Sequence, residues 1–472
     1  MTPALMVQGT ASGVGKSWVA TAICAALARR GLSVAPFKAW NMSNNAAPAW
    51  GPHGWGEIGR AQAVQARAAG RAPTVDMNPL LLKPMGLSGA DVVVCGRSRG
   101  PMRVAEYQAA HDELWAEVTA AYARLAATAD VVVLEGAGSP AEINLRGDMA
   151  NMEMARHAGA SVLLVGDIDK GGVFASLYGT VMLLPPEDRA RVAGLVVNRF
   201  RGDPSGLQPG LARLATLCGV PVRGVLPFRD DVYVDDEDAA TLVSTTLAST
   251  AGAIDVCVLH LPTVANATDL GALGREPGVG VRYVADAGAI GNPDLLVIPG
   301  SRDTEADLRW VRGRGLDRVV VAAAARGIPL LGLCGGYQML GARLGAERGL
   351  GLLPVDTEYA AQKEIRPVRG VTTGAWLLPA GLPVEGYEIH AGRTIAGEGL
   401  VRVDGAGLDG AVVGLVAGTY VHGLLDSAEV RGALVAALRE RRGLDAIAVG
   451  AGAGFDALAD VIDAHLDLSG LV

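Results

Sequence analysis

The chain has 472 residues, of which 50% are hydrophobic and 19% are charged, with a formal net charge of −8. At about 100–200 residues per domain this length predicts two to four domains, and the apolar content excludes a chain that is disordered throughout. The acidic balance and the low aromatic content of 4% disfavour nucleic acid as a partner, because its binders present basic surfaces and stacking platforms.

The cysteines indicate the cellular setting. Five are present, far apart and without a CxxC pair, which argues against a disulfide framework or a zinc site and is typical of a reducing cytosol. The first residues lack a basic region and a cleavage motif, and no apolar run reaches the about 18 residues that a membrane span needs. We therefore expect a cytoplasmic protein without a membrane partner.

Short apolar runs alternate with helical patterns along the first half of the chain. Strands are expected at 4–8, 32–37, 131–134, 162–165 and 195–197, and a helix over Lys16–Arg30 with Gly31 at its end. This alternation predicts a mostly parallel sheet with both faces covered, and functional residues at the carboxyl ends of its strands.

The pattern restarts after the acidic stretch at Asp230–Asp238. Strands are expected at 254–260, 295–299 and 329–333, and an amphipathic helix at 455–468. The sequence thus predicts an α/β fold throughout, with a first domain over 1–235, a linker over 236–252, a second domain over 253–440 and a helical extension over 441–472.

Residues 9–17 read GTASGVGKS and lie between an expected strand and an expected helix, the context of a phosphate-binding loop. Backbone N–H groups of this turn, including those of Thr10, Gly13 and Gly15, would surround phosphates together with the helix N-terminus. Lys16 would reach the terminal phosphates and the Ser17 hydroxyl would bind Mg²⁺. Thr10 stands where the first glycine is usual; dethiobiotin synthetase and the division ATPases have a similar shifted loop.

Polar residues follow three further strands of the first half. Glu135 ends one of them, where acids of the Walker B type hold Mg²⁺, and Asp167 and Asp169 follow another. Asn198 follows the third, where related folds place an adenine-binding asparagine; a plain loop asparagine is the alternative.

A cysteine in the second half has the setting of a nucleophile. Gly332–Gly336 reads GLCGG between a strand and a helical pattern, which is the nucleophile-elbow arrangement with Cys334 in place of serine. The helix N-terminus favours the thiolate, and backbone N–H groups near Gly300 and Gly335 would form an oxyanion hole. The alternative is a buried cysteine in a glycine-rich turn, and the other four cysteines are interpreted as core residues.

A cysteine nucleophile needs a base, and histidine is scarce, with seven in the chain. His422, in TYVHGLLDS, follows an apolar strand and precedes a glycine, so it is the preferred base. His390, in GYEIHAG, is the second choice.

In their order along nearly the whole chain, these motifs resemble the cobyric acid synthases, glutamine-dependent amidases of cobalamin biosynthesis. The matching segments of this sequence are GTASGVGKS at 9–17, PFKAWNMSNNA at 36–46, EIGRAQAVQA at 57–66, DMNPLLLKP at 76–84, EGAGSPAEINL at 135–145 and NRFRGD at 198–203, followed by PGSRDT, GLCGGYQMLG, GYEIHAG and YVHGL. Trp40, Ala46 and Lys170 depart from the residues usual in the family. Ordinary class I glutamine amidotransferases carry the motif H-x-E, in which a glutamate two positions after the histidine orients it. Here Leu424 stands two after His422, so Glu388 and Asp426 are candidates to orient this histidine.

The resemblance implies a P-loop NTPase-type domain followed by a flavodoxin-like class I glutamine amidotransferase domain. It implies ATP, glutamine and a corrinoid as substrates, with Mg²⁺ held by Ser17, Glu135 and Glu57. Glu388 and His390 would lie in the glutamine site. Lys38 and Asn41 would face phosphate or substrate, with simple loop residues as the alternative.

The activity implied by the resemblance couples two reactions. Cys334 would release ammonia from glutamine through a thioester, and ATP would activate a substrate carboxylate as an acyl phosphate. The implied products are amides at carboxylates b, d, e and g of adenosyl-cobyrinic acid a,c-diamide.

Three alternatives stay open. The first is cobyrinic acid a,c-diamide synthase, although the PFKxxNM and DMNPxLLKP segments favour cobyric acid synthase. The second is a partitioning-type ATP switch, which gives no reason for the Cys334 turn. The third is a scaffold with an inactive amidotransferase half, against which the intact Cys334 and His422 speak.

Overall fold

The chain forms two compact units. The computed structural model describes residues 2–85, 89–144, 147–229, 231, 232, 234, 253–395, 398–447, 450 and 454–472. Unit 1 comprises Met1–Ser43, Ala49–Glu237 and Gly452–Val472, and unit 2 comprises Asn44–Pro48 and Asp238–Ala451. The linker predicted at 236–252 lies outside the described residues.

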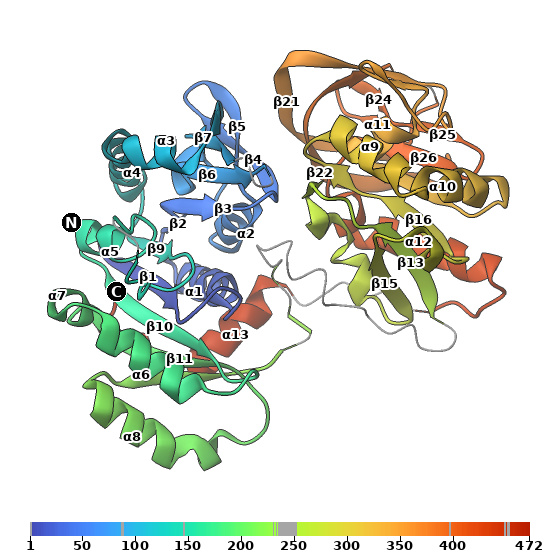
Figure 1. Cartoon of the computed structure of the whole chain (residues 1–472). Coiled ribbons are helices and arrows are strands. Elements are labelled where there is room, and N and C mark those ends of the chain that lie inside the picture. Colours follow the sequence, from blue (N-terminus) through green and yellow to red (C-terminus); the bar gives the residue numbers. More distant parts are fainter. Residues whose placement is uncertain are drawn as a thin grey trace. The chain divides into compact units, whose positions relative to one another are not determined.

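A six-stranded parallel sheet forms the centre of unit 1 (Figure 1). On β1, Met6 is in register with Val162 on one side and with Leu134 on the other. The inner strands are continuous buried apolar runs because helices cover both faces. The five strands predicted in the first half are confirmed, and the sheet has a sixth strand, β12, that the sequence analysis does not predict. In sheet order the strands are β12 (Val222–Pro227), β11 (Val192–Phe200), β10 (Ser161–Asp167), β1 (Ala4–Gly9), β9 (Val131–Glu135) and β2 (Val34–Phe37).

The helix that follows β1 is alanine-rich and buried over most of its surface. This helix, α1, spans Lys16–Arg29, and Gly31 just beyond it has a left-handed φ of 87°, as a glycine after a helix end commonly does. The other helices of this part of unit 1 are α2 (Arg60–Ala68), α3 (Val104–Ala109), α4 (His111–Ala126), α5 (Met152–Ala158), α6 (Val173–Leu183), α7 (Pro186–Arg189) and α8 (Gln208–Cys218).

Unit 1 also contains a smaller sheet that the sequence analysis does not predict. It has the order β3–β6–β7–β8, in which only β3 and β6 run parallel. Its strands are β3 (Trp40–Met42), β6 (Leu80–Pro84), β7 (Ala90–Val94) and β8 (Arg97–Met102). A separate pair is formed by β4 (Ala46–Gly51), whose first three residues are assigned to unit 2, and β5 (Gly54–Gly59).

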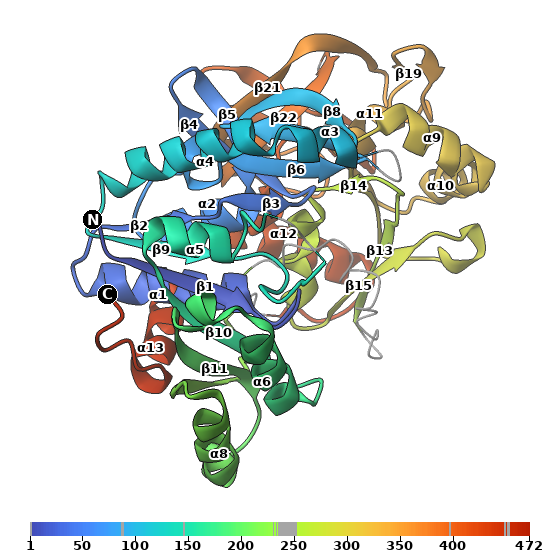
Figure 2. The same cartoon turned by 60° about the vertical axis from the view of Figure 1, so that its left-hand side comes forward.

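The C-terminal segment returns to unit 1. Helix α13 (Phe455–His465) packs against α1, and both figures of the whole chain show the two helices side by side (Figures 1 and 2). Leu458, Val461 and Ile462 of α13 are buried in one hydrophobic cluster with residues of α1. Beyond the helix, Leu466 bridges Gly224 of the edge strand β12. The amphipathic helix predicted here is therefore confirmed, and it completes the core of unit 1.

Replacing Ile462 by alanine tests this role of α13. Ile462 is fully buried, so the variant should lose about 2–5 kcal/mol of unfolding free energy. Calorimetry of the full chain measures this loss. Asp456→Ala, at an exposed position of the same helix, is the control and should lose at most about 1 kcal/mol. Equal transitions for the two variants would contradict the packing of α13.

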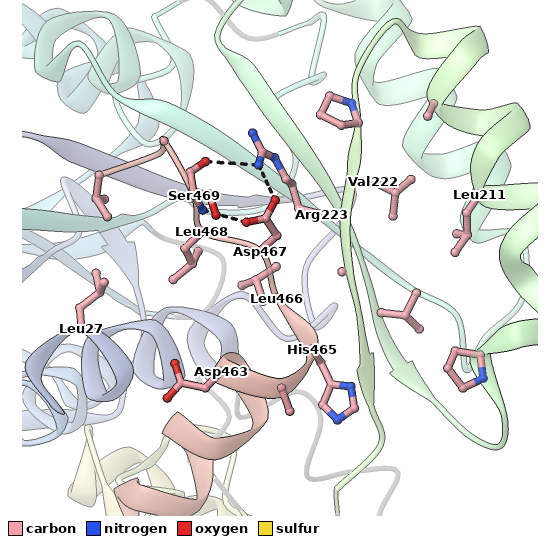
Figure 3. A pocket seen from close by; sticks show the side chains of 18 of the residues that line it. Leu27, Leu211, Val222, Arg223, Asp463, His465, Leu466, Asp467, Leu468 and Ser469 are labelled. Atoms are coloured by element: carbon pink, nitrogen blue, oxygen red, sulfur yellow. Dashed lines mark hydrogen bonds and ion pairs between the residues drawn. The ribbon is translucent and has the colours of Figure 1, made fainter. Parts of the chain in front are cut away.

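A pocket of about 1040 Å³ lies between the C-terminal segment, α8 and β12 (Figure 3). Arg223 crosses it and donates to Asp467 at 2.8 Å and to the Ser469 carbonyl at 3.3 Å. None of the residues that the sequence analysis singles out as functional lines this pocket.

The central sheet of unit 2 is parallel except for β25, which runs antiparallel to β26. The three strands predicted in the second half are confirmed as β13, β16 and β18, and the sheet contains three more. In sheet order the strands are β15 (Val279–Val284), β13 (Ile254–Leu259), β16 (Leu295–Ile298), β18 (Leu330–Leu333), β26 (Val416–Thr419) and β25 (Ala411–Val413). The helices are α9 (Thr304–Gly313), α10 (Leu316–Ala325), α11 (Gly335–Leu340) and α12 (Ala428–Arg441).

Antiparallel strands extend unit 2 beyond this sheet. The two longest, β21 (Asp356–Thr373) and β22 (Ala380–Thr394), pair with each other. The short strands β14 (Val264–Ala265) and β17 (Gly300–Ser301) form a separate pair. The remaining strands are β19 (Arg343–Leu344), β20 (Glu347–Arg348), β23 (Val401–Val403) and β24 (Gly407–Asp409).

All five cysteines are free thiols. Cys24, Cys218 and Cys257 are buried and Cys95 is half-buried, in line with their interpretation as packing residues. Among the residues that the structure describes, every helix is too short or too polar to cross a bilayer.

Candidate functional site

The predicted phosphate loop lies between β1 and α1, as its spacing requires. Gly15 has a φ of 95°, and a Cβ atom there would lie 2.2 Å from Nδ2 of Asn198. Asn198 donates to the Val14 carbonyl at 2.9 Å, and the Thr10 N–H donates to the Val165 carbonyl at 2.9 Å. Hydrogen bonds to the neighbouring strands therefore hold the loop in place. The predicted contact of Asn198 with the adenine ring of a nucleotide stays a prediction.

Glu135, at the end of β9, is the centre of a buried polar cluster. Its carboxylate accepts hydrogen bonds from Ser17 Oγ at 2.8 Å, Lys38 Nζ at 2.9 Å and Gln65 Nε2. Burial disfavours the carboxylate, but the charge of Lys38 and these hydrogen bonds hold the pKa of Glu135 below its ordinary value. The cluster thus keeps a carboxylate charged beside the phosphate loop.

The remaining residues predicted for this site are already engaged. Lys16 Nζ donates to the carbonyls of Ala11 and Gly138 at 2.9 and 3.1 Å. Asn41 donates to Gln62 at 3.0 Å, and Glu57 forms a buried ion pair with Lys83. The roles of Asn41 toward substrate and of Glu57 toward Mg²⁺ stay predictions.

The described residues contain no group of three or more His, Cys, Asp and Glu side chains suited to hold a metal ion. Ser17 and Glu135 do offer a hydroxyl and a charged carboxylate 2.8 Å apart. This donor set fits Mg²⁺, which is usually bound by one or two protein oxygens together with substrate phosphates.

In unit 2, Cys334 stands at a sharp turn between β18 and α11. Its φ of 49° and ψ of −103° are sparsely populated for a residue with a side chain, as at other strained nucleophile turns. A Cβ atom on Gly336 would lie 1.9 Å from the Ile298 carbonyl oxygen. The glycine at that position thus lets the turn approach the end of β16.

His422 lies beyond β26 and is 2% exposed. Its Nδ1 atom is 2.6 Å from Oδ2 of Asp269, whose other oxygen accepts from the Gly423 N–H at 3.0 Å. Its ring also stacks on Tyr387, with centroids 5.3 Å apart. The sequence analysis places Glu388 or Asp426 as the orienting acid, and the structure corrects this to Asp269.

The charge of His422 follows from these neighbours. Burial lowers its pKa, but the attraction and hydrogen bond of Asp269, together with Cys334, outweigh burial and raise the pKa to about 10. His422 therefore carries a proton at neutral pH. Since Cys334 is among the groups that raise this pKa, the protonated ring lies close enough to the cysteine side chain to act as its proton donor.

The two glycines predicted for the oxyanion hole lie near this pair. A Cβ atom on Gly300 would be 3.5 Å from Cε1 of His422, and one on Gly335 would be 2.7 Å from the backbone N of Ser301. Ser301 Oγ donates to the buried carboxylate of Asp307 at 2.7 Å. The loop at Gly300 is thereby held against the Cys334 turn.

Glu388 and His390 lie on β22. Glu388 forms an ion pair with Arg366 at 2.8 Å and is 3.6 Å from His390 Nε2. His390 stacks on Tyr420, with centroids 3.7 Å apart. Cys334 is also close to this strand, with Sγ 3.8 Å from the Ile389 carbonyl. The roles of Glu388 and His390 toward glutamine stay predictions.

Asp269 and Gln65 are site residues that the sequence analysis misses. Asp269 lies 153 positions before His422, on the 3-10 helix η5 (Ala267–Leu270), and no motif marks it. Gln65 is a buried polar residue on α2, and its place in the EIGRAQAVQA segment at 57–66 is a signal in the sequence that could have pointed to it.

Comparison with known proteins agrees with both halves of this description. The family model described as CobQ/CobB/MinD/ParA nucleotide binding domain matches residues 5–242. The model described as CobB/CobQ-like glutamine amidotransferase domain matches residues 255–430.

Curated relatives match over nearly the full length. The cobyric acid synthase of Desulforudis audaxviator is 51% identical, with 94% of this chain and 91% of that protein covered. The cobyric acid synthase of Mycobacterium ulcerans is 46% identical, with 100% and 96% covered. Among solved structures, PurLQS from Thermotoga maritima aligns with 39% of this chain and 98% of its own, at 18% identity and a TM-score of 0.33. The chain therefore belongs to the cobyric acid synthase family of glutamine-hydrolysing ligases.

Proposed function

We propose that this chain amidates carboxylates b, d, e and g of adenosyl-cobyrinic acid a,c-diamide to give cobyric acid, using ATP and ammonia released from glutamine. The observation that carries the proposal is the pairing, in one chain, of the Cys334–His422–Asp269 arrangement with the phosphate loop and its Glu135 cluster. The full-length likeness to cobyric acid synthases supports the corrinoid as substrate.

The amidotransferase reaction begins at Cys334. Its sulfur attacks the side-chain amide carbon of glutamine as the thiolate, with the thiol proton on His422, and N–H groups near Gly300 and Gly335 stabilise the oxygen that becomes negative. His422 gives its proton to the departing nitrogen, and ammonia leaves. Water, deprotonated by His422, then hydrolyses the thioester to glutamate. Asp269 positions the His422 ring and stabilises its charged form.

The synthetase reaction takes place at the phosphate loop. A substrate carboxylate oxygen attacks the γ-phosphorus of ATP, which forms an acyl phosphate and ADP. Ammonia then attacks the acyl carbon, phosphate leaves, and the nitrogen loses a proton to give the amide. Lys16 and the loop N–H groups would hold the phosphates and balance their charge. Ser17 and Glu135 would hold Mg²⁺, which neutralises phosphate charge when it is bound.

Mass spectrometry of the corrinoid product tests the proposed function. The full chain, ATP, Mg²⁺ and glutamine should convert the adenosylated a,c-diamide in four successive amide increments. Two increments on unamidated cobyrinic acid, with none on the a,c-diamide, would assign the chain to the a,c-diamide synthase reaction. ATP hydrolysis without amidation of either corrinoid would contradict the proposal and favour an ATP switch.

Gly15→Ala is expected to abolish ATP-dependent amidation with glutamine or with ammonia. The added methyl group would meet Asn198 Nδ2 at 2.2 Å on a backbone with φ 95°, so the phosphate loop must distort. We expect the amidation rate to fall at least about 100-fold, since a displacement of about 1 Å in such a site can cost that much in rate, and ATP binding to weaken as well, which calorimetric titration measures. Gly31→Ala is the matched control, because Gly31 also has a left-handed φ but no neighbour within 4 Å. Unchanged ATP affinity in Gly15→Ala would contradict the assigned loop.

A further inference from the structure

A short stretch of the N-terminal sequence lies in the amidotransferase unit. Residues Asn44–Pro48 belong to unit 2, whereas the chain up to Ser43 belongs to unit 1. Ala46 follows Lys38 by only eight positions, and Lys38 is the cation that pairs with Glu135 beside the phosphate loop. The same covalent segment therefore starts at the predicted phosphate site and ends within unit 2.

Within unit 2, this segment is held by Asn266. The Ala46 N–H donates to Asn266 Oδ1 at 2.9 Å in a buried hydrogen bond, and the Asn266 N–H approaches the Asn44 carbonyl oxygen at 3.4 Å. Asn266 is 5% exposed. Because the donor is a backbone N–H, the contact does not depend on the side chain at position 46, where this sequence departs from its family.

Asn266 also joins two parts of the glutamine-hydrolysing site. Directly before it, Ala265 of β14 pairs with Gly300 of β17, the loop assigned to the oxyanion hole. Three positions after it comes Asp269, which holds His422 at 2.6 Å. Asn266 itself has a left-handed backbone with φ 49°, so it is the turn at which the chain leaves β14 and enters η5.

This placement gives one residue influence over two catalytic features. A displacement at Asn266 moves the strand that supports Gly300 and the short helix that carries Asp269. Misplacement by about 1 Å in such a site can cost about 100-fold in rate. One hydrogen bond at Asn266, if it shifts Gly300 or Asp269 by this much, is therefore sufficient to change the rate of glutamine hydrolysis.

We infer that Asn266 is a positioning residue through which the Lys38–Ala46 segment makes glutamine hydrolysis at Cys334 depend on the ligands of the phosphate site. Binding of ATP and a carboxylate substrate beside Lys38 shifts this segment, and the Ala46–Asn266 hydrogen bond passes the shift to β14 and η5. Ammonia is then released mainly when an acceptor is ready. The inference rests on the proposed function, because it assumes that both reactions occur in this chain.

The test measures glutamate release by the full chain with and without ligands. The ligands are an ATP analogue with a non-hydrolysable β–γ bond and adenosyl-cobyrinic acid a,c-diamide. Typical coupling between sites is about 5- to 150-fold, so ligands should raise the wild-type rate within this range. In Asn266→Gly the ratio of the two rates should fall close to one.

The choice of variants separates tethering from a structural role. Glycine keeps the left-handed backbone but removes the acceptor, and Asn266→Asp keeps an acceptor oxygen and should retain the wild-type ratio. An Asn266→Gly enzyme that is slower with and without ligands, but keeps the same ratio, would overturn the inference. The inference would also be overturned if the wild-type rate of glutamate release were the same with and without the ligands. If Asn266→Gly does not fold, Ala46→Pro removes the backbone N–H that donates to Asn266, and the ratio of the rates with and without ligands should again fall close to one. A wild-type ratio in that variant overturns the inference.

Failure of the inference and failure of the proposed function are distinguishable in these assays. Four amide increments with a rate ratio that Asn266 does not affect would refute the coupling and leave the amidation reaction standing. Ligand-dependent glutamate release without any amide would refute the proposed product and leave the coupling standing.

Discussion

Cys334→Ala is expected to abolish amidation with glutamine while amidation with free ammonia continues. The variant has no sulfur to form the thioester, and loss of a nucleophile costs up to about 10⁶-fold in kcat in other enzymes, so glutamate release should fall at least about 10⁴-fold. The synthetase reaction uses ammonia from any source and depends on residues of unit 1. Product mass spectra with glutamine or an ammonium salt measure both effects.

Cys257→Ala is the control for this variant. Cys257 lies on β13 of the same unit, and burial raises the pKa of its thiol to about 12, so it stays protonated at neutral pH. We expect its loss to cost stability and to leave glutamine hydrolysis largely intact. Equal loss of glutamine-dependent activity in both cysteine variants would refute the assignment of Cys334 as nucleophile.

Asp269→Asn is expected to lower the kcat of glutamine hydrolysis about 10²- to 10⁴-fold, the upper value being that of the corresponding change in a serine protease. The reason is electrostatic. Without the charge of Asp269, burial dominates and the pKa of His422 falls from about 10. The protonated form is then lost as pH rises through the lower value, so the basic limb of the kcat/KM profile should move to lower pH. Stopped glutaminase assays across a pH series measure this shift.

The matched control is Asp255→Asn. Asp255 pairs with Arg282 at 2.8 Å at the start of β13, away from the carboxyl ends of the strands that carry the site. It should leave both the rate and the pH profile nearly unchanged. A large fall in rate for Asp269→Asn with an unmoved basic limb would mean that Asp269 supports the fold and does not set the charge of His422.

The central sheets were predictable because their strands are strong local patterns. β1, β9, β10, β13, β16 and β18 are short, largely apolar runs, and parallel strands buried on both faces have this signature. The β21–β22 pair is different. It is largely exposed along β21, so its residues are polar and lack a clear apolar pattern, and long-range antiparallel pairing leaves little local trace.

The site shows the same division between local and distant information. Lys16, Ser17 and Cys334 lie in motifs whose chemistry follows from consecutive residues, and Glu135 follows from its place at a strand end. Asp269 has no such context, since its relation to His422 is created by the order of β13, β16, β18 and β26 in the folded sheet. Sequence reasoning therefore names Cys334 and His422 as the candidate nucleophile and base, and it misses Asp269, which contacts His422.

The return of α13 to unit 1 has a consequence for synthesis on the ribosome. Unit 1 completes its core with residues of Gly452–Val472, which follow the whole stretch Asp238–Ala451 of unit 2. At about 5–20 residues per second, translating that stretch takes roughly 10–40 seconds. During this interval the face of α1 that Leu458 and Ile462 later cover is open to solvent. The nascent first unit should then be a substrate for chaperones until the last helix emerges, and the amidotransferase unit should reach its native state first.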